Sequence, residues 1–258
     1  MTDDYRVSSP SVADAFAGSV DDVSPTPPAA APAPVFPPQH GTRSSYDREI
    51  AEIKDNVLRM GSMVEDAIRE AIAALVAHDA ERALQVIMDD RQINEIQRKV
   101  TAMIAATIAT QQPVARDLRY LLTLDHVAYE LERMGDHAGS VAKQARKLAP
   151  FPPLHGHVEL PELGERVADL VQGIIRALVD VDEQQARAVA KLDDEVDHIY
   201  HRNFDEVLRH MRENADNVEP GTRILFASHY LERIGDRVTN IAEDIVFLAS
   251  GEVEDLNQ

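Results

Sequence analysis

The sequence predicts an all-α protein, in which two pseudo-symmetric three-helix bundles lie side by side behind a disordered Pro/Ala-rich tail. Apolar residues recur at helical spacings of three and four along most of the chain. The phrase Leu-Glu-Arg-x-Gly-Asp occurs twice, at residues 131–136 and 231–236. Eight of the fourteen prolines lie in residues 1–42. We therefore expect a tail over residues 1–42, one bundle over 43–150 and a second over 151–258.

The predicted tail is recognised by its composition. Prolines alternate with alanine, serine and aspartate, and the stretch from Pro25 to Pro38 is a Pro/Ala tract. Such a segment cannot bury enough apolar surface to offset the cost of ordering its backbone. We expect it to be disordered and to be unnecessary for folding.

The first half reads as three helices. The first of them is indicated by apolar residues on one face, namely Ile50, Ile53, Val57, Met60, Val64, Ala67, Ala71 and Leu75. After a break near His78, a second helix carries Ile93, Val100, Ile104 and Ile108. Pro113 suits the first turn of a third helix, because a missing N–H costs nothing there. That helix runs to about Leu148.

The second half repeats this plan after prolines 150, 152 and 153, which stop the preceding helix. Its first helix is marked by Val167, Leu170, Val171, Ile174, Leu178 and Val181. Its second helix is marked by Val196, Tyr200, Phe204, Val207, Leu208 and Met211. Pro220 introduces a third helix that runs to about Ala249, with Gly251 beyond its end. Three long helices can bury a core of their own.

The composition excludes several classes of function. The formal net charge is −19, which disfavours direct binding to nucleic acid and attracts cations and basic protein surfaces. The chain has no cysteine, so any metal would be held by oxygen or histidine ligands. No secretory signal and no uninterrupted apolar run of about 18 residues is present. We expect a cytoplasmic protein.

Carboxylates gather beside the apolar stripe of each predicted third helix. Glu132 and Asp136 are one helical turn apart, Glu232 and Asp236 repeat them, and Glu243 reaches the same flank from the other side. The second helices add Asp193 with Asp197, and Asp90 with Asn94, on their core-facing sides. Carboxylates on an apolar face are costly unless they are paired or bind metal.

Two interpretations of the repeated phrase stay open. Its carboxylates either form ion pairs with neighbouring arginines and lysines, or bind divalent or trivalent cations through oxygen. Gly135 and Gly235 each cost about 1 kcal/mol against alanine within a helix. Their retention in both copies indicates that something approaches the backbone closely there.

Two three-helix repeats that each carry Leu-Glu-Arg-x-Gly-Asp resemble the PhoU family, the phosphate-signalling regulators of bacteria. The segment Pro113-Val114-Ala115-Arg116-Asp117-Leu118-Arg119 and residues 231–243 also match that family's pattern. The resemblance implies multinuclear metal clusters of iron, manganese, zinc or magnesium. Together with the reasoning above, it gives the candidate ligands Asp90, Glu132, Asp136, Asp193, Asp197, Glu232, Asp236 and Glu243.

The resemblance also implies a biological role. It predicts a cytoplasmic regulator that restrains the phosphate-starvation response and is not an enzyme. The implied partners are a PhoR-like sensor histidine kinase and the PstB-like ATPase of the phosphate importer, at the membrane surface but without insertion into it. We also expect a homodimer.

The two halves differ at their acidic edges. Asn94 stands where the second half has Asp197, and Lys143 stands where it has Glu243. Both differences predict a weaker cation site in the first half.

An alternative function is a di-iron carboxylate enzyme, which needs Glu-x-x-His on two helices. Glu195 and His198 have that spacing, and the first half has no counterpart. A purely structural helical protein is the third hypothesis.

Overall fold

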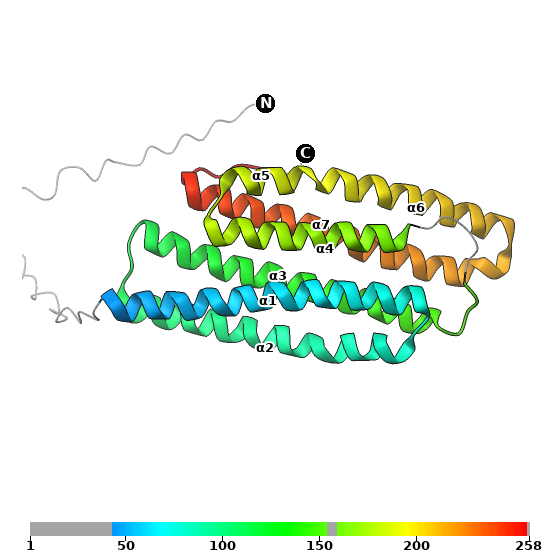
Figure 1. Ribbon diagram of the computed structural model, residues 1–258, viewed down its shortest axis with the longest axis horizontal. Coiled ribbons are helices and arrows are strands. Elements are labelled where there is room, and N and C mark those ends of the chain that lie inside the picture. Colours follow the sequence, from blue (N-terminus) through cyan, green and yellow to red (C-terminus); the bar gives the residue numbers. More distant parts are fainter. Residues whose placement is uncertain (1–42, 154–158, 257–258) are drawn as a thin grey trace, which may run out of the picture. The chain divides into compact units, whose positions relative to one another are not determined.

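The computed structural model describes residues 43–153 and 159–256, which lie within one compact unit over residues 39–258. Seven α-helices and one short 3-10 helix make up its regular structure, and no strand occurs in these ranges (Figure 1). The all-α prediction is confirmed. The predicted tail lies outside the described residues.

The first half contains α1 (Arg43–Ala77), α2 (Ala80–Gln111) and α3 (Arg116–Leu148). Asp79 caps α2, since its side chain accepts hydrogen bonds from the backbone N–H groups of Glu81 and Arg82. The placement of Pro113 in the first turn of α3 was wrong. Ala115 has a φ of 48°, which a right-handed helix does not allow, so α3 begins only at Arg116.

The second half contains α4 (Leu160–Asp180), α5 (Glu183–Lys191), α6 (Asp193–Glu213), the 3-10 helix η1 (Ala215–Asn217) and α7 (Val218–Ser250). The single second helix expected here is divided at Leu192, where the backbone reaches φ −76° and ψ −11°. Asp182 caps α5 as Asp79 caps α2. The division places Asp193 in the first turn of α6, where carboxylates are favoured by the helix dipole.

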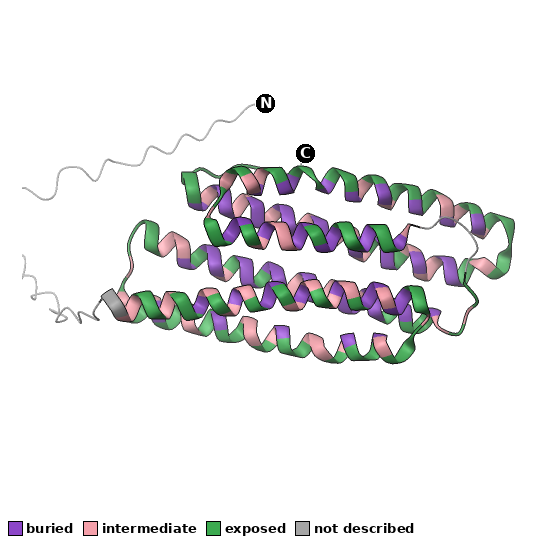
Figure 2. Cartoon of the chain, viewed as in Figure 1, coloured by how far each residue is buried: buried purple, intermediate pink, exposed green. Residues whose placement is uncertain are grey.

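Helices α3 and α7 form the centre of the described body and run antiparallel (Figure 1). Helices α1 and α2 pack against α3, helices α4, α5 and α6 pack against α7, and α1 contacts α4. One hydrophobic cluster extends through both halves, and its buried residues follow the inner faces of the helices (Figure 2). Its largest fully buried side chains include Leu131, Met134 and Leu231 from the two copies of the repeated phrase.

Polar and aromatic contacts set the register between α3 and α7. The Arg119 guanidinium lies 5.3 Å from the ring centre of Phe247, and Arg237 pairs with Glu130 at 3.3 Å. The rings of His137 and Tyr230 stack with centres 6.0 Å apart. Residue numbers therefore rise on one helix as they fall on the other. The two Leu-Glu-Arg-x-Gly-Asp segments consequently lie at the same level of the molecule.

Candidate functional site

The acidic edge of the second half is formed by α6 and α7. Asp193 is 9% exposed, and its Oδ2 accepts a hydrogen bond of 3.4 Å from Thr239 Oγ1, whereas its Oδ1 has no hydrogen-bond partner. Burial in the first place, and then the charges of Asp197 and Asp236, raise the pKa of Asp193 to about 7. Burial and Asp236 also raise the pKa of Asp197. These carboxylates are close enough to oppose one another's ionisation.

Glu232 belongs to the same edge. Burial raises its pKa to about 7, with a further contribution from the charge of Asp236. Its Oε2 makes no hydrogen bond, although His229 Nδ1 lies 3.3 Å away. Two of the four acids at this edge therefore carry an unpartnered buried oxygen, a costly arrangement without a cation or a proton.

The acidic edge of the first half is formed in the same way by α2 and α3. Burial raises the pKa of Asp90, followed by the charge of Asp136, whereas Lys143 acts in the opposite direction. Asn94 Nδ2 donates to Asp90 Oδ2 at 3.4 Å, and Asp90 Oδ1 has no partner. Burial also raises the pKa of Glu132, and its Oε2 likewise makes no hydrogen bond. The lysine and the amide leave this edge less negative than the second.

The arginine of the repeated phrase pairs with the aspartate in both copies, and in the first copy it also contacts the glutamate. Arg233 Nη1 lies 2.6 Å from Asp236 Oδ2, and Arg133 Nη1 lies 3.2 Å from Asp136 Oδ2. Both arginines are partly exposed. Arg133 Nε also lies 3.4 Å from Glu132 Oε2, whereas the neighbour of Glu232 Oε2 is His229 Nδ1 at 3.3 Å. The ion-pair interpretation thus accounts for both carboxylates of the first copy and for the aspartate of the second.

The glycines of the repeated phrase make room for a carboxylate from the neighbouring helix. A methyl group at Gly235 would overlap Asp193 Oδ1, and one at Gly135 would stand 3.3 Å from Asp90 Oδ1. The expectation that something approaches the backbone at both glycines is confirmed. In the second half the approaching group is Asp193, and in the first half it is Ile93, whose Cδ1 would lie 3.0 Å from the methyl group, followed by Asp90.

Glu243 lies on α7 but is engaged elsewhere. Its Oε1 accepts a hydrogen bond of 2.8 Å from the backbone N–H of Leu256. It is not among the charges that raise the pKa of Asp193 or Glu232.

Thr239, the hydrogen-bond donor to Asp193, was not among the residues predicted from the sequence. It follows Glu232 by seven residues, which places it on the same flank of α7, and a search of that flank for hydroxyl groups would have found it.

The donor set of each edge fits a cation that prefers oxygen ligands, because each edge contains buried carboxylate oxygens without a hydrogen bond. Across residues 43–153 and 159–256, however, no three histidine, aspartate or glutamate side chains stand together as a preformed metal-holding group. A cation would have to draw these carboxylates together.

The Glu-x-x-His pair of the alternative enzyme lies on the outside of the molecule. Glu195 and His198 are both exposed on α6, and Glu195 lies 3.7 Å from Arg166. A di-iron centre of the ferritin type needs these ligands to project into the bundle core. Their position therefore disfavours that enzyme.

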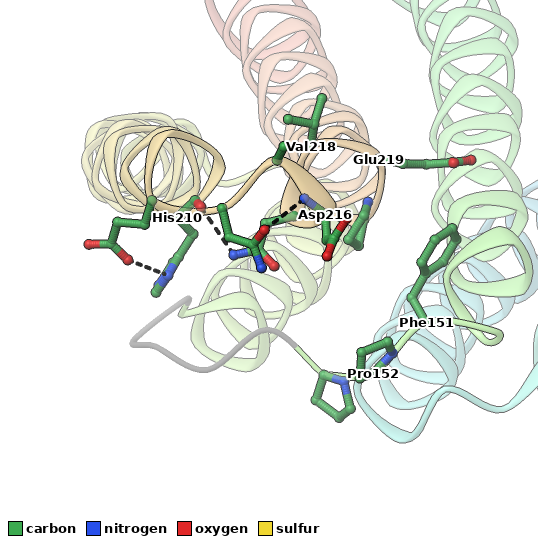
Figure 3. Close-up of a pocket in the computed structure, with 12 residues that line it drawn as sticks. Phe151, Pro152, His210, Asp216, Val218 and Glu219 are labelled. Atoms are coloured by element: carbon green, nitrogen blue, oxygen red, sulfur yellow. Dashed lines mark hydrogen bonds and ion pairs between the residues drawn. The ribbon is translucent and has the colours of Figure 1, made fainter.

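A cavity with a volume of about 990 Å³ lies at the turn between α6 and α7 (Figure 3). Phe151, Pro152, His210, Asp216 and Glu219 are among its lining residues. None of the eight candidate ligands lines it. The chemistry suggested by the sequence is thus separate from this cavity.

Comparison with known proteins identifies the fold. The profile of the PhoU domain matches twice, at residues 57–145 and 160–245. The chain belongs to the PhoU family. A PhoU homologue from Clostridium acetobutylicum, described as a phosphate-specific transport system accessory protein, is 36% identical over 84% of this chain and 99% of its own length.

Solved PhoU structures share this architecture. PhoU from Pseudomonas aeruginosa superimposes with a TM-score of 0.77 at 33% identity, over 80% of this chain and 100% of that chain. PhoU from Streptococcus pneumoniae, described as a phosphate transport system regulatory protein, gives a TM-score of 0.75 at 27% identity, over 81% and 99% of the two chains. Among the described residues, no helix is both long and apolar enough to cross a membrane.

Proposed function

We propose that this PhoU-family chain is a non-enzymatic regulator that represses the phosphate-starvation response, by coupling a phosphate importer to a sensor histidine kinase. The observation that carries the proposal is the PhoU domain match in both halves. It is supported by a relative, matched over 99% of its length, that is described as an accessory protein of phosphate-specific transport.

The proposed partners follow from family membership and charge. They are a PhoR-like kinase and the PstB-like ATPase, which the chain meets as a homodimer at the cytoplasmic membrane surface. A net charge of −19 steers a protein toward basic patches, and the association rate then falls as the salt concentration rises. The packed helices would act as a rigid body that holds the kinase in its non-signalling state while phosphate is plentiful.

Cations are the proposed ligands of the two acidic edges. Glu132, Asp136 and Asp90 would hold a metal ion in the first half, and the second half would use the larger set Asp193, Asp197, Glu232 and Asp236. Iron, manganese, zinc and magnesium all accept carboxylate oxygens. When bound, the metal would supply positive charge to carboxylates whose mutual repulsion is otherwise uncompensated. The carboxylates themselves would hold the metal between the second and third helices of each half.

The regulatory role is tested by deleting the gene and measuring alkaline phosphatase, or another starvation output, in phosphate-rich medium. We expect constitutive expression, reversed by a plasmid copy of the gene. Normal repression in a deletion strain whose genome holds no second copy would rule out the role.

The cation sites are tested by titrating Mn²⁺ into two paired variants. We expect Glu232→Ala/Asp236→Ala to lose more affinity than Glu132→Ala/Asp136→Ala, because the second edge has more anionic donors. Equal losses would contradict the asymmetry, and the absence of binding to the unaltered protein would contradict the metal sites.

A further inference from the structure

The chain beyond α7 folds back along the second half instead of leaving the body. Helix α7 ends at Ser250, and Gly251 adopts a φ of 83° while its N–H donates to Phe247 O at 2.8 Å. This left-handed residue, which glycine adopts without strain, reverses the direction of the chain. Residues 251–256 form what we call the C-terminal strap.

Two residues of the C-terminal strap, Glu254 and Leu256, fasten it to the body. Arg187 of α5 makes two bonds of 2.7 Å to the two carboxylate oxygens of Glu254, and it also holds Glu183 at 2.8 Å. The backbone N–H of Leu256 donates to Glu243 at 2.8 Å, and the Leu256 side chain packs against the hydrophobic core. The strap is thus held by a two-pronged ion pair, a hydrogen bond and an apolar anchor.

The fastened strap lies at the acidic edge. A cavity of about 470 Å³ is lined by Glu254, Asp255 and Leu256 of the strap together with Asp193 and Asp197 of α6. Thr239, the hydrogen-bond donor to Asp193, lines the same cavity. The strap therefore forms a wall of the space from which a solvated ion reaches Asp193.

Among the described residues, this fastening occurs in the second half alone. Arg187 follows the capping residue Asp182 by five positions, and the residue five positions after the equivalent cap, Asp79, is Leu84. Leu84 is exposed and cannot pair with a carboxylate. The first acidic edge has no equivalent fastening.

We propose that the C-terminal strap is a detachable cover of the second acidic edge, closed by the Arg187–Glu254 pair. The cover slows both the entry of cations to Asp193 and Asp197 and their release. Arg187 and Glu254 are partly exposed, so salt screens their pair and favours opening of the cover. The cation is the one assigned under the proposed function, but the opening of the strap is measurable without it.

The cover is tested by carboxyl footprinting of the metal-free protein, using a water-soluble carbodiimide with a small amine and peptide mass spectrometry. We expect Glu254→Gln, and truncation after Ser250, to raise the labelling rate of Asp193 and Asp197 about fivefold. Labelling of Asp90 and Asp136 should not change. Glu252→Gln removes the same charge from the strap outside the pair and should label like the unaltered protein.

Unchanged labelling of Asp193 and Asp197 in Glu254→Gln and in the truncated protein would overturn the cover. Equal increases in Glu254→Gln and Glu252→Gln would also overturn it, because the effect would then come from charge alone. Melting curves of each variant identify a truncated protein that fails to fold, and Glu254→Gln then decides.

A second measurement follows Mn²⁺ release into excess chelator, in a Glu132→Ala/Asp136→Ala background that leaves only the second edge. We expect release to be about fivefold faster with Glu254→Gln. Equal rates would overturn the cover. If the unaltered protein binds no Mn²⁺, the proposed cation sites fail, and the footprinting result alone decides the cover.

Discussion

Asp193 occupies the space that a side chain on Gly235 would take, so the carboxylate of α6 lies directly against the backbone of α7. Asp90 lies against Gly135 in the first half, but its Oδ1 would stand 3.3 Å from an added methyl group and would not overlap it. The glycine and the aspartate form a pair that the sequence separates by 42 residues in one half and by 45 in the other. The glycine in Leu-Glu-Arg-x-Gly-Asp is therefore explained by its neighbour, not by the helix that contains it.

Gly235→Ala is expected to displace the Asp193 carboxylate and to lower the Mn²⁺ affinity of the second edge by roughly tenfold. The metal-free stability should stay within about 1 kcal/mol of the unaltered protein, because the gain in helix propensity offsets the movement of a short side chain. Calorimetric titration and thermal unfolding measure the two effects separately.

Two further glycines provide controls for that variant. Gly139→Ala should raise stability by about 1 kcal/mol without changing affinity, since nothing lies within 4 Å of the added methyl group. Gly135→Ala should have an intermediate effect on the first edge, because its nearest neighbours are Ile93 Cδ1 at 3.0 Å and Asp90 Oδ1 at 3.3 Å. An unchanged Mn²⁺ affinity in Gly235→Ala would contradict the role given to the pair.

Local pattern predicted much of this fold. The spacing of apolar residues such as Ile53, Val57 and Met60 predicted the helices, and the duplicated phrase predicted the two similar halves. The split between α5 and α6 escaped prediction because Leu192 departs only slightly from helical geometry and carries no glycine or proline signal.

Side-chain contacts between helices could not be predicted from the sequence pattern. The carboxylate pairs were named as candidates from their spacing. Which partner each one takes depends on side-chain rotamers: Arg233 pairs with Asp236, and Glu232 Oε2 is left without a hydrogen bond. The hydrogen bond from Leu256 to Glu243 depends on the path of the chain after Gly251. Periodicity contains no information about such a path.

The ionisation of Asp193 is expected to lower the stability of the metal-free protein as the pH rises from about 4 to about 7. Folding raises the pKa of this carboxyl from its ordinary 3.8 to about 7, so the folded state holds the proton more tightly. The stabilisation is complete below the unfolded pKa and is lost as the pH passes through the folded one.

Asp193→Asn removes this titration and is the variant that measures it. At pH 8 and without metal, we expect it to be more stable than the unaltered protein by roughly 2 to 4 kcal/mol, and near pH 4 the two should converge. Denaturant unfolding at several pH values gives the comparison. Asp194→Asn, at the exposed neighbouring position, should leave the pH profile unchanged. A constant difference between Asp193→Asn and the unaltered protein across this range would refute the assignment.

Asn94→Asp should strengthen the first acidic edge. It restores the carboxylate that Asp197 supplies in the second half, and we expect the Mn²⁺ affinity of the first edge to rise roughly tenfold. The metal-free protein should become less stable, because the hydrogen bond from Asn94 to Asp90 is replaced by repulsion between two acids. Titration in a Glu232→Ala/Asp236→Ala background isolates the first edge.

The exposed Gln92 provides a charge control for that experiment. Gln92→Glu adds the same charge to α2, two residues from Asp90 and on a different face, so its effect on affinity should be small. A similar rise in both variants would show that general electrostatic attraction, and not a ligand position, is responsible.

Arg237→Ala is expected to destabilise the contact between α3 and α7 by roughly 2 to 4 kcal/mol. Arg237 Nη1 lies 3.3 Å from Glu130 Oε2, and the Glu130 side chain is only 3% exposed, so removal of the arginine leaves a charge in the interior. Glu130→Gln combined with Arg237→Ala should recover most of the loss, because the buried group is then neutral. Arg209→Ala, which breaks exposed pairs on α6, should cost much less than Arg237→Ala. Denaturant unfolding of the four proteins decides the matter: if Arg237→Ala is no more costly than Arg209→Ala, the buried pair does not hold the two halves together.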